Sequence, residues 1–260
     1  PDIVNIFLKS KITKFSSIRA NLFMNYREYP IGGNLLALFH YLIQRFFNYS
    51  IVMNKEMYKQ VYKFSKREPI LIYNFIDESY LKKFFKPKIV KSQRFTYIFI
   101  GRLIERKGII ELIDAFSKVL SVKNAYLHIL GDGPLRNAVD EIIFEKGIES
   151  NITVHGFIDS PYEILSNADV FVLPSYSEGT SRACLEALYL GIPSILRDVD
   201  GNKELEHREN ISLFEKNSKL PDLMLQKASQ SRSRESRKNL LPYEFSREYN
   251  LNLYLKLFRN

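Results

Sequence analysis

Two acidic side chains lie on either side of a predicted helix start, and their spacing is the first feature that suggests chemistry. Glu178 and Glu186 belong to the stretch SEGTSRACLEALYLGIP, residues 177–193. In a helix that begins just after Glu178, Glu186 lies roughly 7.5 Å along the axis and leans back toward the amino end. Both carboxylates therefore reach the helix start, where they can accept hydrogen bonds from hydroxyl groups. The alternative is an ordinary acid at a helix start followed by a solvated helix residue.

The same stretch offers hydrogen-bond donors to an anion. Gly179 lets a ligand approach the backbone, and Thr180 or Ser181 can cap the helix. Backbone amides near Thr180, Ser181 and Arg182 then face the ligand from the positive end of the helix. A phosphate held by these amides, between hydroxyl groups held by the two glutamates, is the layout of a nucleotide diphosphate sugar.

A second motif supplies positive charge. The stretch GRLIERKG, residues 101–108, leaves a predicted strand through one glycine and enters a predicted helix through another. Between them lie Arg102 and Lys107. An arginine can fork onto two phosphate oxygens and a lysine acts as a point charge, so the pair suits a diphosphate. Two solvated cations in a loop are the alternative.

A third motif is a tight turn at the rim of the same predicted cleft. In LGDGPLRN, residues 130–137, Gly133 is free to adopt positive φ, Asp132 can cap a helix, and Pro134 suits its first position. We expect a structural role for this turn.

These motifs need a scaffold, and the chain beyond residue 94 predicts one in which strands and helices alternate. The predicted strands are 95–101, 125–131, 152–156, 169–175, 193–197 and 211–214. The predicted helices are 108–121, 134–146, 161–167, 181–190 and 202–207. This alternation indicates an α/β fold, a Rossmann-like doubly wound parallel sheet with helices on both faces. Ligands bind at the carboxyl edge of such a sheet, where the motifs lie.

The first 94 residues predict a smaller, incomplete unit. Residues 1–8 and 70–76 have the pattern of strands, and residues 35–47 and 54–65 have helical spacing. This is too little for a second doubly wound domain, so we expect that an amino-terminal part of the fold lies outside this sequence. The predicted division is a partial amino-terminal, acceptor-side lobe (1–76), a linker (77–94), a carboxyl-terminal nucleotide-sugar-binding domain (95–242), and a helix (243–260) that packs back toward the first lobe.

Charge and composition narrow the classes of partner. The chain has 260 residues and a formal net charge of +9. Residues 1–94 hold 17 Lys and Arg against 6 Asp and Glu, so the positive excess lies there and predicts an anionic partner. A single cysteine, Cys184, excludes an internal disulfide, and the four histidines have no metal-ligand spacing. The aromatic residues mostly occupy apolar runs, which argues against nucleic acid.

The basic first third also suits a membrane surface. The residues that can attract anionic lipid are Arg19, Arg27, Arg45, Lys55 and Lys59. The predicted helix at 35–47 can offer an apolar face to lipid, although no stretch is long enough to span a bilayer. Packing of that face in the protein core is the alternative.

Taken in order along the chain, these motifs resemble one family. Glu178 and Glu186, with seven residues between them, are followed by ALYLGIP and preceded by GRLIERKG and GDGPLRN. This combination resembles the retaining GT-B glycosyltransferases of family 4. The resemblance covers residues 70–205, with IYNFID before the linker and GNKE (201–204) after the last motif. It implies a GT-B fold in which the carboxyl-terminal Rossmann-like domain faces a second, here incomplete, Rossmann-like lobe.

The resemblance implies roles for individual residues. The donor-binding residues are then Arg102, Lys107, Phe157, Glu178, Gly179, Thr180, Ser181, Arg182 and Glu186. Among them the two cations bind the donor diphosphate, Glu178 contacts the sugar, Glu186 contacts the ribose, and Phe157 lies near the nucleobase. The expected catalytic residues are Glu178, Arg102 and Lys107, with no metal or other cofactor.

The implied reaction is transfer of a hexose or N-acetylhexosamine from a nucleotide-diphosphate sugar, expected to be UDP-linked, with the anomeric configuration retained. The acceptor is a hydroxyl of a lipid-diphosphate-linked glycan, because EGTSR resembles members that extend bacterial surface glycans such as O-antigen and lipopolysaccharide. Such a protein is expected in the cytoplasm, peripheral at the inner face of the membrane, with the anionic membrane surface as a partner.

Two alternatives stay open. The chain can be a non-catalytic sugar-nucleotide-binding remnant that serves as a partner subunit of another transferase. The short sequence DVD, Asp198–Asp200, resembles the metal-binding acid pair of the other large glycosyltransferase fold. We expect a metal-free transfer instead, in which Arg102, Lys107 and the helix amides neutralise the diphosphate.

Overall fold

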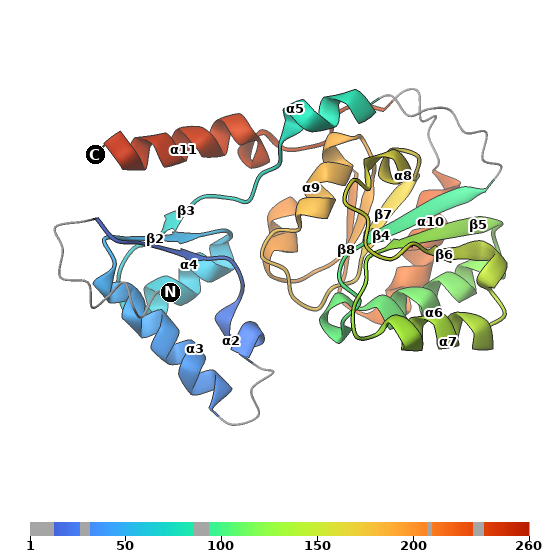
Figure 1. Ribbon diagram of the computed structural model, residues 1–260, viewed down its shortest axis with the longest axis horizontal. Helices are drawn as coiled ribbons and strands as arrows, with labels where there is room; N and C mark the ends of the chain where they lie inside the picture. The colour runs from blue at the N-terminus through green and yellow to red at the C-terminus, as the bar shows by residue number, and fades with distance from the viewer. Residues whose placement is uncertain (1–12, 27–31, 86–93, 207–209, 231–236, 260) are drawn as a thin grey trace.

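The computed structural model describes residues 13–26, 32–85, 94–206, 210–230 and 237–259, and it contains two parallel sheets. Figure 1 shows them as separate lobes, with the smaller sheet and its helices at one end and the larger sheet at the other. The predicted strand at 1–8 lies outside the described residues. The predicted division of the chain at residues 76, 94 and 242 stays a prediction.

The larger lobe is built on a six-stranded sheet of order β6-β5-β4-β7-β8-β9. The strands are β4 Phe95–Ile100, β5 Ala125–Leu130, β6 Ile152–Val154, β7 Val170–Leu173, β8 Ser194–Arg197 and β9 Ile211–Phe214. All neighbouring pairs are parallel, which confirms the predicted sheet. The strand order reverses between β4 and β7, so their carboxyl ends open the crevice in which such sheets bind ligands.

Helices cover both faces of this sheet. They are α6 Ile109–Leu120, α7 Arg136–Glu145, α8 Tyr162–Ser166, α9 Arg182–Tyr189 and α10 Leu220–Ser229. Figure 1 shows α6, α7 and α10 on one face and α8 and α9 on the other. Because both faces are covered, the central strands are largely apolar, and Ile98, Phe99 and Val172 are fully buried.

The structure corrects three expectations for this lobe. The predicted helix at 202–207 is instead a 3₁₀ segment, η6 Asp200–Leu205. Helix α7 begins at Arg136, with Leu135 in the cap position, so Pro134 precedes it. Helix α10 was not predicted; it packs mainly against α6 and buries Leu220, Met224 and Ala228.

The smaller lobe has a three-stranded parallel sheet of order β1-β2-β3. Its elements are β1 Phe15–Ile18, α2 Leu22–Asn25, α3 Gly33–Leu42, η2 Ile43–Phe46, β2 Tyr49–Val52, α4 Lys55–Ser65 and β3 Ile70–Leu71. The predicted helices at 35–47 and 54–65 are therefore present, whereas β1 and β2 were not predicted and the strand expected at 70–76 is short. The core of this lobe centres on Tyr41, Val52 and Val61, all fully buried.

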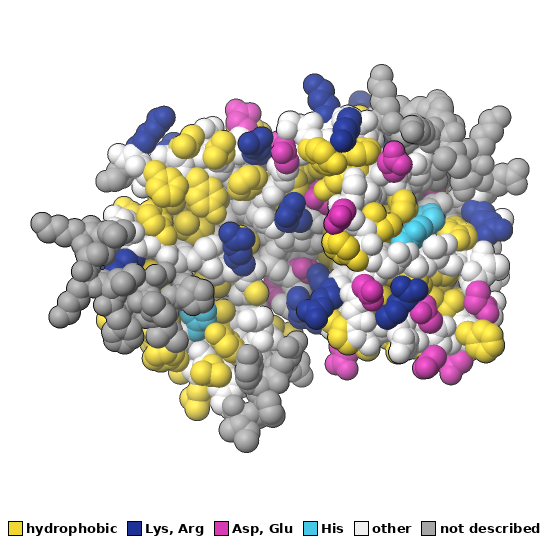
Figure 2. Space-filling view, in the orientation of Figure 1, with side chains coloured by type: hydrophobic (Ala, Val, Ile, Leu, Met, Phe, Trp, Pro, Cys, Tyr) yellow, Lys and Arg dark blue, Asp and Glu magenta, His cyan; other side chains and the backbone are white. Residues whose placement is uncertain are grey.

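Helix α3 buries less of its apolar surface than core packing requires. Ala37 and Tyr41 are fully buried against α2 and α4, but Leu35 is 72% exposed and Phe39 51% exposed. Figure 2 shows hydrophobic side chains gathered over this part of the smaller lobe. Core packing therefore accounts for one narrow stripe of the helix.

The polypeptide passes between the lobes twice. The first crossing follows β3 and includes α5 Glu78–Leu81 and η3 Lys82–Phe84. The second leads through η9 Tyr243–Phe245 into α11 Arg247–Arg259, which reaches the smaller sheet, where the ring of Phe258 lies 5.4 Å from that of Phe15. Within the described part of the chain, no helix has the length and hydropathy needed to cross a membrane.

Candidate functional site

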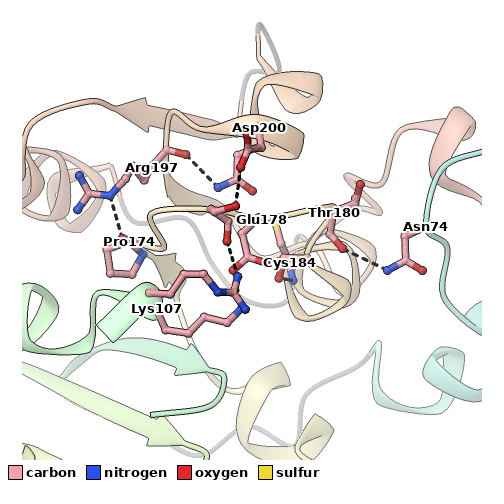
Figure 3. Close-up of polar contacts among 12 residues, drawn as sticks. Asn74, Lys107, Pro174, Glu178, Thr180, Cys184, Arg197 and Asp200 are labelled. Atoms are coloured by element: carbon pink, nitrogen blue, oxygen red, sulfur yellow. Dashed lines mark hydrogen bonds and ion pairs between the residues drawn. The ribbon is translucent and has the colours of Figure 1, made fainter. Parts of the chain in front are cut away.

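The structure brings one predicted cation and one predicted carboxylate into direct contact at the strand crossover. Lys107 closes the 3₁₀ turn η4 Glu105–Lys107 after β4, and Glu178 lies in the loop after β7. Lys107 Nζ lies 2.5 Å from Glu178 Oε1, and the side chains are only 16% and 8% exposed. Figure 3 shows the two side chains pointing toward one another. A mostly buried ion pair therefore occupies the mouth of the crevice.

The loop after β7 fixes how α9 begins. Ser181 is the cap residue, because its side-chain oxygen accepts a hydrogen bond from the Cys184 amide at 3.3 Å. The Thr180 hydroxyl instead donates to the Met53 carbonyl of the smaller lobe at 3.2 Å. Glu178 lies in the loop before the cap, so it is not an ordinary acid in the first turn of the helix.

Glu186 lies inside α9 and is buried. Its exposed fraction is 7%, and burial raises the pKa of its carboxyl, while Arg182 and Tyr162 lower it. Tyr162 donates its hydroxyl to Glu186 Oε1 at 3.3 Å, and Arg182 Nη2 lies 3.8 Å from the same oxygen. The alternative of a solvated helix residue is therefore wrong for Glu186. Its carboxylate already accepts a hydrogen bond from a hydroxyl group, that of Tyr162.

Arg102 and Phe157 lie at the same edge of the sheet but outside these contacts. The Arg102 side chain is exposed and forms no ion pair or hydrogen bond with the described residues. Phe157 follows β6 and is 76% exposed. Both side chains are therefore accessible to a ligand, and their assigned roles stay predictions.

Gly179 serves a contact that the sequence did not suggest. A Cβ atom at this position would lie 2.6 Å from the Arg19 carbonyl oxygen of the smaller lobe. A Cβ at Gly201 would lie 1.4 Å from the Gly179 carbonyl oxygen. The Gly201 amide also donates to the Glu178 carbonyl at 3.0 Å. The bare Cα of Gly179 therefore lets the backbone of the smaller lobe pass closely at Arg19, whereas we expected it to admit a ligand, and the bare Cα of Gly201 lets the Gly179 carbonyl pass within the larger lobe.

Three further side chains hold this loop, and sequence reasoning missed them. Arg106 donates from Nη1 to the Ser177 carbonyl at 2.7 Å. From the smaller lobe, Asn54 donates to the Gly179 carbonyl at 2.8 Å and Asn74 to the Thr180 carbonyl at 3.1 Å. Asn54 is the first residue of a predicted helix and Asn74 lies in IYNFID, but neither position indicates a partner more than 100 residues away.

Arg197 places a buried positive charge behind the same loop. It is 5% exposed and lies at the end of β8. Its guanidinium donates to the Pro174 carbonyl at 2.9 Å and the Glu215 carbonyl at 3.1 Å, and it stacks on the Tyr176 ring at 4.1 Å. Burial lowers its pKa. Figure 3 shows it on the far side of Pro174 from the Lys107–Glu178 pair.

The acids of the DVD sequence have different partners. Asp200 accepts from the Ser177 hydroxyl at 2.6 Å and from the Asn21 side-chain amide at 3.3 Å. Asp198 lies 3.9 Å from Lys203 Nζ. Among the described residues, no group of three or more His, Cys, Asp or Glu is placed to hold a metal ion. In the turn after β5, Asp132 accepts from the next amide, Gly133, and does not cap α7.

A cleft of about 910 Å³ lies beside the ion pair, between the lobes. Met24 of the smaller lobe forms one wall, and Arg106, Ile110 and Leu135 belong to the other. Tyr176 and Glu111 add polar groups, and the Tyr176 hydroxyl donates to Glu111 at 2.5 Å. Figure 2 shows the surface hollowed between the lobes. None of the nine predicted donor-binding residues lines this cleft.

Known proteins that resemble this chain agree with the fold described above. A model of the family described as Glycosyl transferases group 1 matches residues 80–240. An uncharacterized glycosyltransferase of Methanocaldococcus jannaschii is 29% identical over 216 residues, which are 75% of this chain and 52% of that protein. The UDP-Gal:alpha-D-GlcNAc-diphosphoundecaprenol alpha-1,3-galactosyltransferase of Escherichia coli is 30% identical over 130 residues, 48% of this chain and 34% of that protein. The chain thus spans about half or less of these relatives.

Solved structures show the same architecture. HepE of Anabaena in complex with UDP-glucose matches with a TM-score of 0.76 at 17% identity, over 95% of this chain and 72% of that chain. At this identity the likeness concerns the fold alone.

Proposed function

The chain belongs to the glycosyl transferases group 1 family and has a GT-B fold, and from that premise we propose that it is a retaining hexosyltransferase. The donor is a nucleotide-diphosphate sugar, probed first as the UDP form, that carries a hexose or N-acetylhexosamine. The acceptor is a hydroxyl of a lipid-diphosphate-linked glycan in the synthesis of O-antigen or another bacterial surface polysaccharide. The observation that carries the proposal is the ion pair between Lys107 and Glu178.

The ion pair suits a ligand that has both an anionic and a hydroxyl-bearing part. A nucleotide sugar that enters the crevice offers its diphosphate to Lys107 and a sugar hydroxyl to Glu178, so each side chain exchanges its partner for a ligand group. Both side chains are already shielded from water, so their interactions with the ligand are strong. We propose that Glu186 accepts a hydrogen bond from a ribose hydroxyl, as it now accepts one from the Tyr162 hydroxyl.

The leaving diphosphate needs positive charge and hydrogen-bond donors. We assign this role to Lys107 and to Arg102, whose guanidinium is exposed at the same sheet edge. The amides of Thr180, Ser181 and Arg182 at the start of α9 add donors from the positive end of the helix. This set supports a metal-free transfer. The acceptor hydroxyl attacks from the face that the diphosphate leaves, its proton passes to a phosphate oxygen, and the configuration is retained.

The acceptor side of the proposal rests on the cleft and on the smaller lobe. The name of the Escherichia coli relative specifies a diphosphoundecaprenol acceptor. In this chain the inter-lobe cleft is available to an acceptor glycan, and the exposed residues Leu35 and Phe39 face outward on α3. Together with the basic smaller lobe, this apolar face supports peripheral binding to anionic lipid at the cytoplasmic side of the membrane.

Vesicle flotation tests the membrane part. The chain should float with vesicles that contain anionic lipid and remain behind with neutral vesicles. Leu35→Ser combined with Phe39→Ser should abolish flotation, whereas Val122→Ser, which alters a 71% exposed side chain of the larger lobe, should not. Equal flotation of all three proteins would contradict a role for α3.

A donor screen tests the reaction. The protein is incubated with nucleotide sugars and a lipid-diphosphate acceptor, and release of free nucleotide is measured. Glu178→Gln also leaves Lys107 without its ion-pair partner, so it should lower the melting temperature and abolish turnover even where thermal melting shows the variant to be folded, while the exposed Glu141→Gln should behave as the wild type. Wild-type turnover in Glu178→Gln would refute the assignment. Nucleotide binding without turnover in the unmodified chain would favour the alternative of a non-catalytic partner subunit.

A further inference from the structure

The loop that carries Glu178 is held from the opposite lobe by two asparagine side chains. Asn54 Nδ2 donates to the carbonyl of Gly179 at 2.8 Å, and Asn74 Nδ2 donates to the carbonyl of Thr180 at 3.1 Å. Figure 3 shows Asn74 directed at Thr180. Two successive carbonyl groups of this loop, residues 174–181, thus point into the smaller lobe, although the loop belongs to the larger one. We call this segment the donor loop.

Asn54 is fixed at both ends of its amide. It is fully buried, and its Oδ1 accepts from the Met57 amide at 2.8 Å, which caps the start of α4. Its Nδ2 is then aimed at Gly179 and has little freedom to turn. The Gly179 carbonyl must therefore follow the start of α4.

The direction of these carbonyls sets the direction of the amides that follow them. In a planar trans peptide the C=O and the next N–H point to opposite sides. With the Gly179 carbonyl turned toward Asn54, the Thr180 N–H points away from the smaller lobe, and the Thr180 carbonyl does the same for the Ser181 N–H. Within the described part of the chain neither N–H donates a hydrogen bond, so both are available.

We infer that Asn54 and Asn74 are positioning residues that turn these two peptide groups toward the donor. The inference rests on the proposed function. The smaller lobe then does more than offer a surface to the acceptor, because it orients the backbone donors that meet the donor sugar and phosphate. A donor site formed by the larger lobe alone would lack this orientation.

Asn54→Asp isolates the effect at Asn54. The aspartate has the same shape and still caps α4, but a carboxylate oxygen replaces the N–H donor and faces the Gly179 carbonyl. The peptide should rotate away from this repulsion, taking the Thr180 N–H with it. Asn74→Asp does the same at the second carbonyl and leaves the cap of α4 untouched, so it serves if Asn54→Asp folds poorly.

The experiment compares UDP-glucose with UDP by titration calorimetry on the whole chain, with thermal melting of each variant. In the wild type the sugar should contribute affinity beyond that of UDP. Asn54→Asp and Asn74→Asp should each weaken UDP-glucose binding by roughly tenfold or more while the folded fraction is unchanged. Glu178→Gln should also lose the affinity that the sugar contributes, because it removes the side chain proposed to contact the sugar.

Glu204→Ala is the matched control. Glu204 joins the lobes by accepting from the Lys55 amide at 2.7 Å and the Tyr73 hydroxyl at 3.3 Å, but it does not touch the donor loop. It should weaken the contact between the lobes and leave the ratio of the two affinities unchanged. An equal loss in Glu204→Ala and Asn54→Asp would overturn the inference, since any weakening of the seam would then suffice.

The remaining outcomes separate the inference from its premise. Wild-type affinities in both asparagine variants, together with a loss in Glu178→Gln, would overturn the inference and leave the proposed function standing. Wild-type affinities in Glu178→Gln, or no binding of either ligand to the unmodified chain, would instead contradict the proposed donor site.

Discussion

The two sides of the 174–181 loop handle charge differently. On the crevice side, Lys107 and Glu178 neutralise each other directly at 2.5 Å. On the far side, the Arg197 guanidinium meets backbone carbonyls and an aromatic ring and has no ion-pair partner among the described residues. Two opposite charges in contact can each replace the other with a charged or polar group of a ligand. A cation that donates to backbone carbonyls cannot move to a ligand without breaking the hydrogen bonds that hold the loop. The crevice side is thus suited to binding and the far side to holding.

Removal of Lys107 should give the largest effect. Lys107→Met should lower the rate of transfer by about 10²–10³-fold, because it removes one of the groups proposed to neutralise the departing diphosphate. It also leaves Glu178 buried without its cation, at a cost of about 3 kcal/mol in unfolding free energy. The measurements are nucleotide release under saturating donor and urea denaturation.

The double variant Lys107→Met with Glu178→Gln sharpens this result. It should recover most of the lost stability, since no unpaired charge remains, and recover none of the activity. Recovery of activity would show that the ion pair is structural, and the contrast between the two sides of the loop would fail.

Arg197→Met should lower stability more than it lowers nucleotide affinity. It leaves the Pro174 and Glu215 carbonyls without their donor inside the protein, so the unfolding free energy should fall by about 2 kcal/mol. Nucleotide affinity at a temperature where the variant is folded should change by less than roughly threefold. A large loss of affinity at unchanged stability would place Arg197 among the binding residues and contradict the contrast.

The smallest effect concerns pH and should originate away from the loop. His128 Nδ1 and His155 Nε2 lie 2.9 Å apart at the β5–β6 edge, and burial lowers the pKa of both, that of His128 to about 4. Because the unfolded chain binds more protons, stability should be level above about pH 6.5 and fall between pH 6.5 and pH 4. With solvent screening the loss is on the order of 1 kcal/mol.

Urea denaturation at pH 7 and pH 5 checks this, with the double variant His128→Asn and His155→Asn as the comparison. The double variant should lose most of the slope. Glu186 acts with the opposite sign, because its raised pKa makes the folded state bind the extra proton as the pH falls. A slope that is unchanged in the double variant would assign the pH dependence to other groups.

The sequence predicted the larger lobe well because its signals are local. Several of its strands are short, mostly apolar runs closely followed by glycine or serine, and the parallel sheet buries them on both faces, as at Val170–Leu173. Ser181 was one of two residues named as the cap of α9. In the smaller lobe, β1 was missed because FSSI holds only two apolar residues, and β2, YSIV, was missed because its four residues form a short run between two predicted helices.

The donor loop divides in the same way. Lys107, Glu178 and Glu186 could be named from the sequence because a charged side chain in a short motif indicates a chemistry, and their roles stay predictions. Asn54 and Asn74 were not, because an asparagine near a helix start indicates a cap or a turn and says nothing about a distant carbonyl. Their contacts with Gly179 and Thr180 appear only when β2, β3 and the loop after β7 are placed side by side.

The double passage of the polypeptide between the lobes limits how they can move. The two crossings touch each other, with the ring of Phe245 packed 4.6 Å from that of Tyr73. A single connection would let one lobe swivel freely about it. Two connections that lie side by side confine the opening and closing of the lobes to rotation about one axis through Tyr73 and Phe245. If either segment is cut, the lobes should also be able to twist relative to each other.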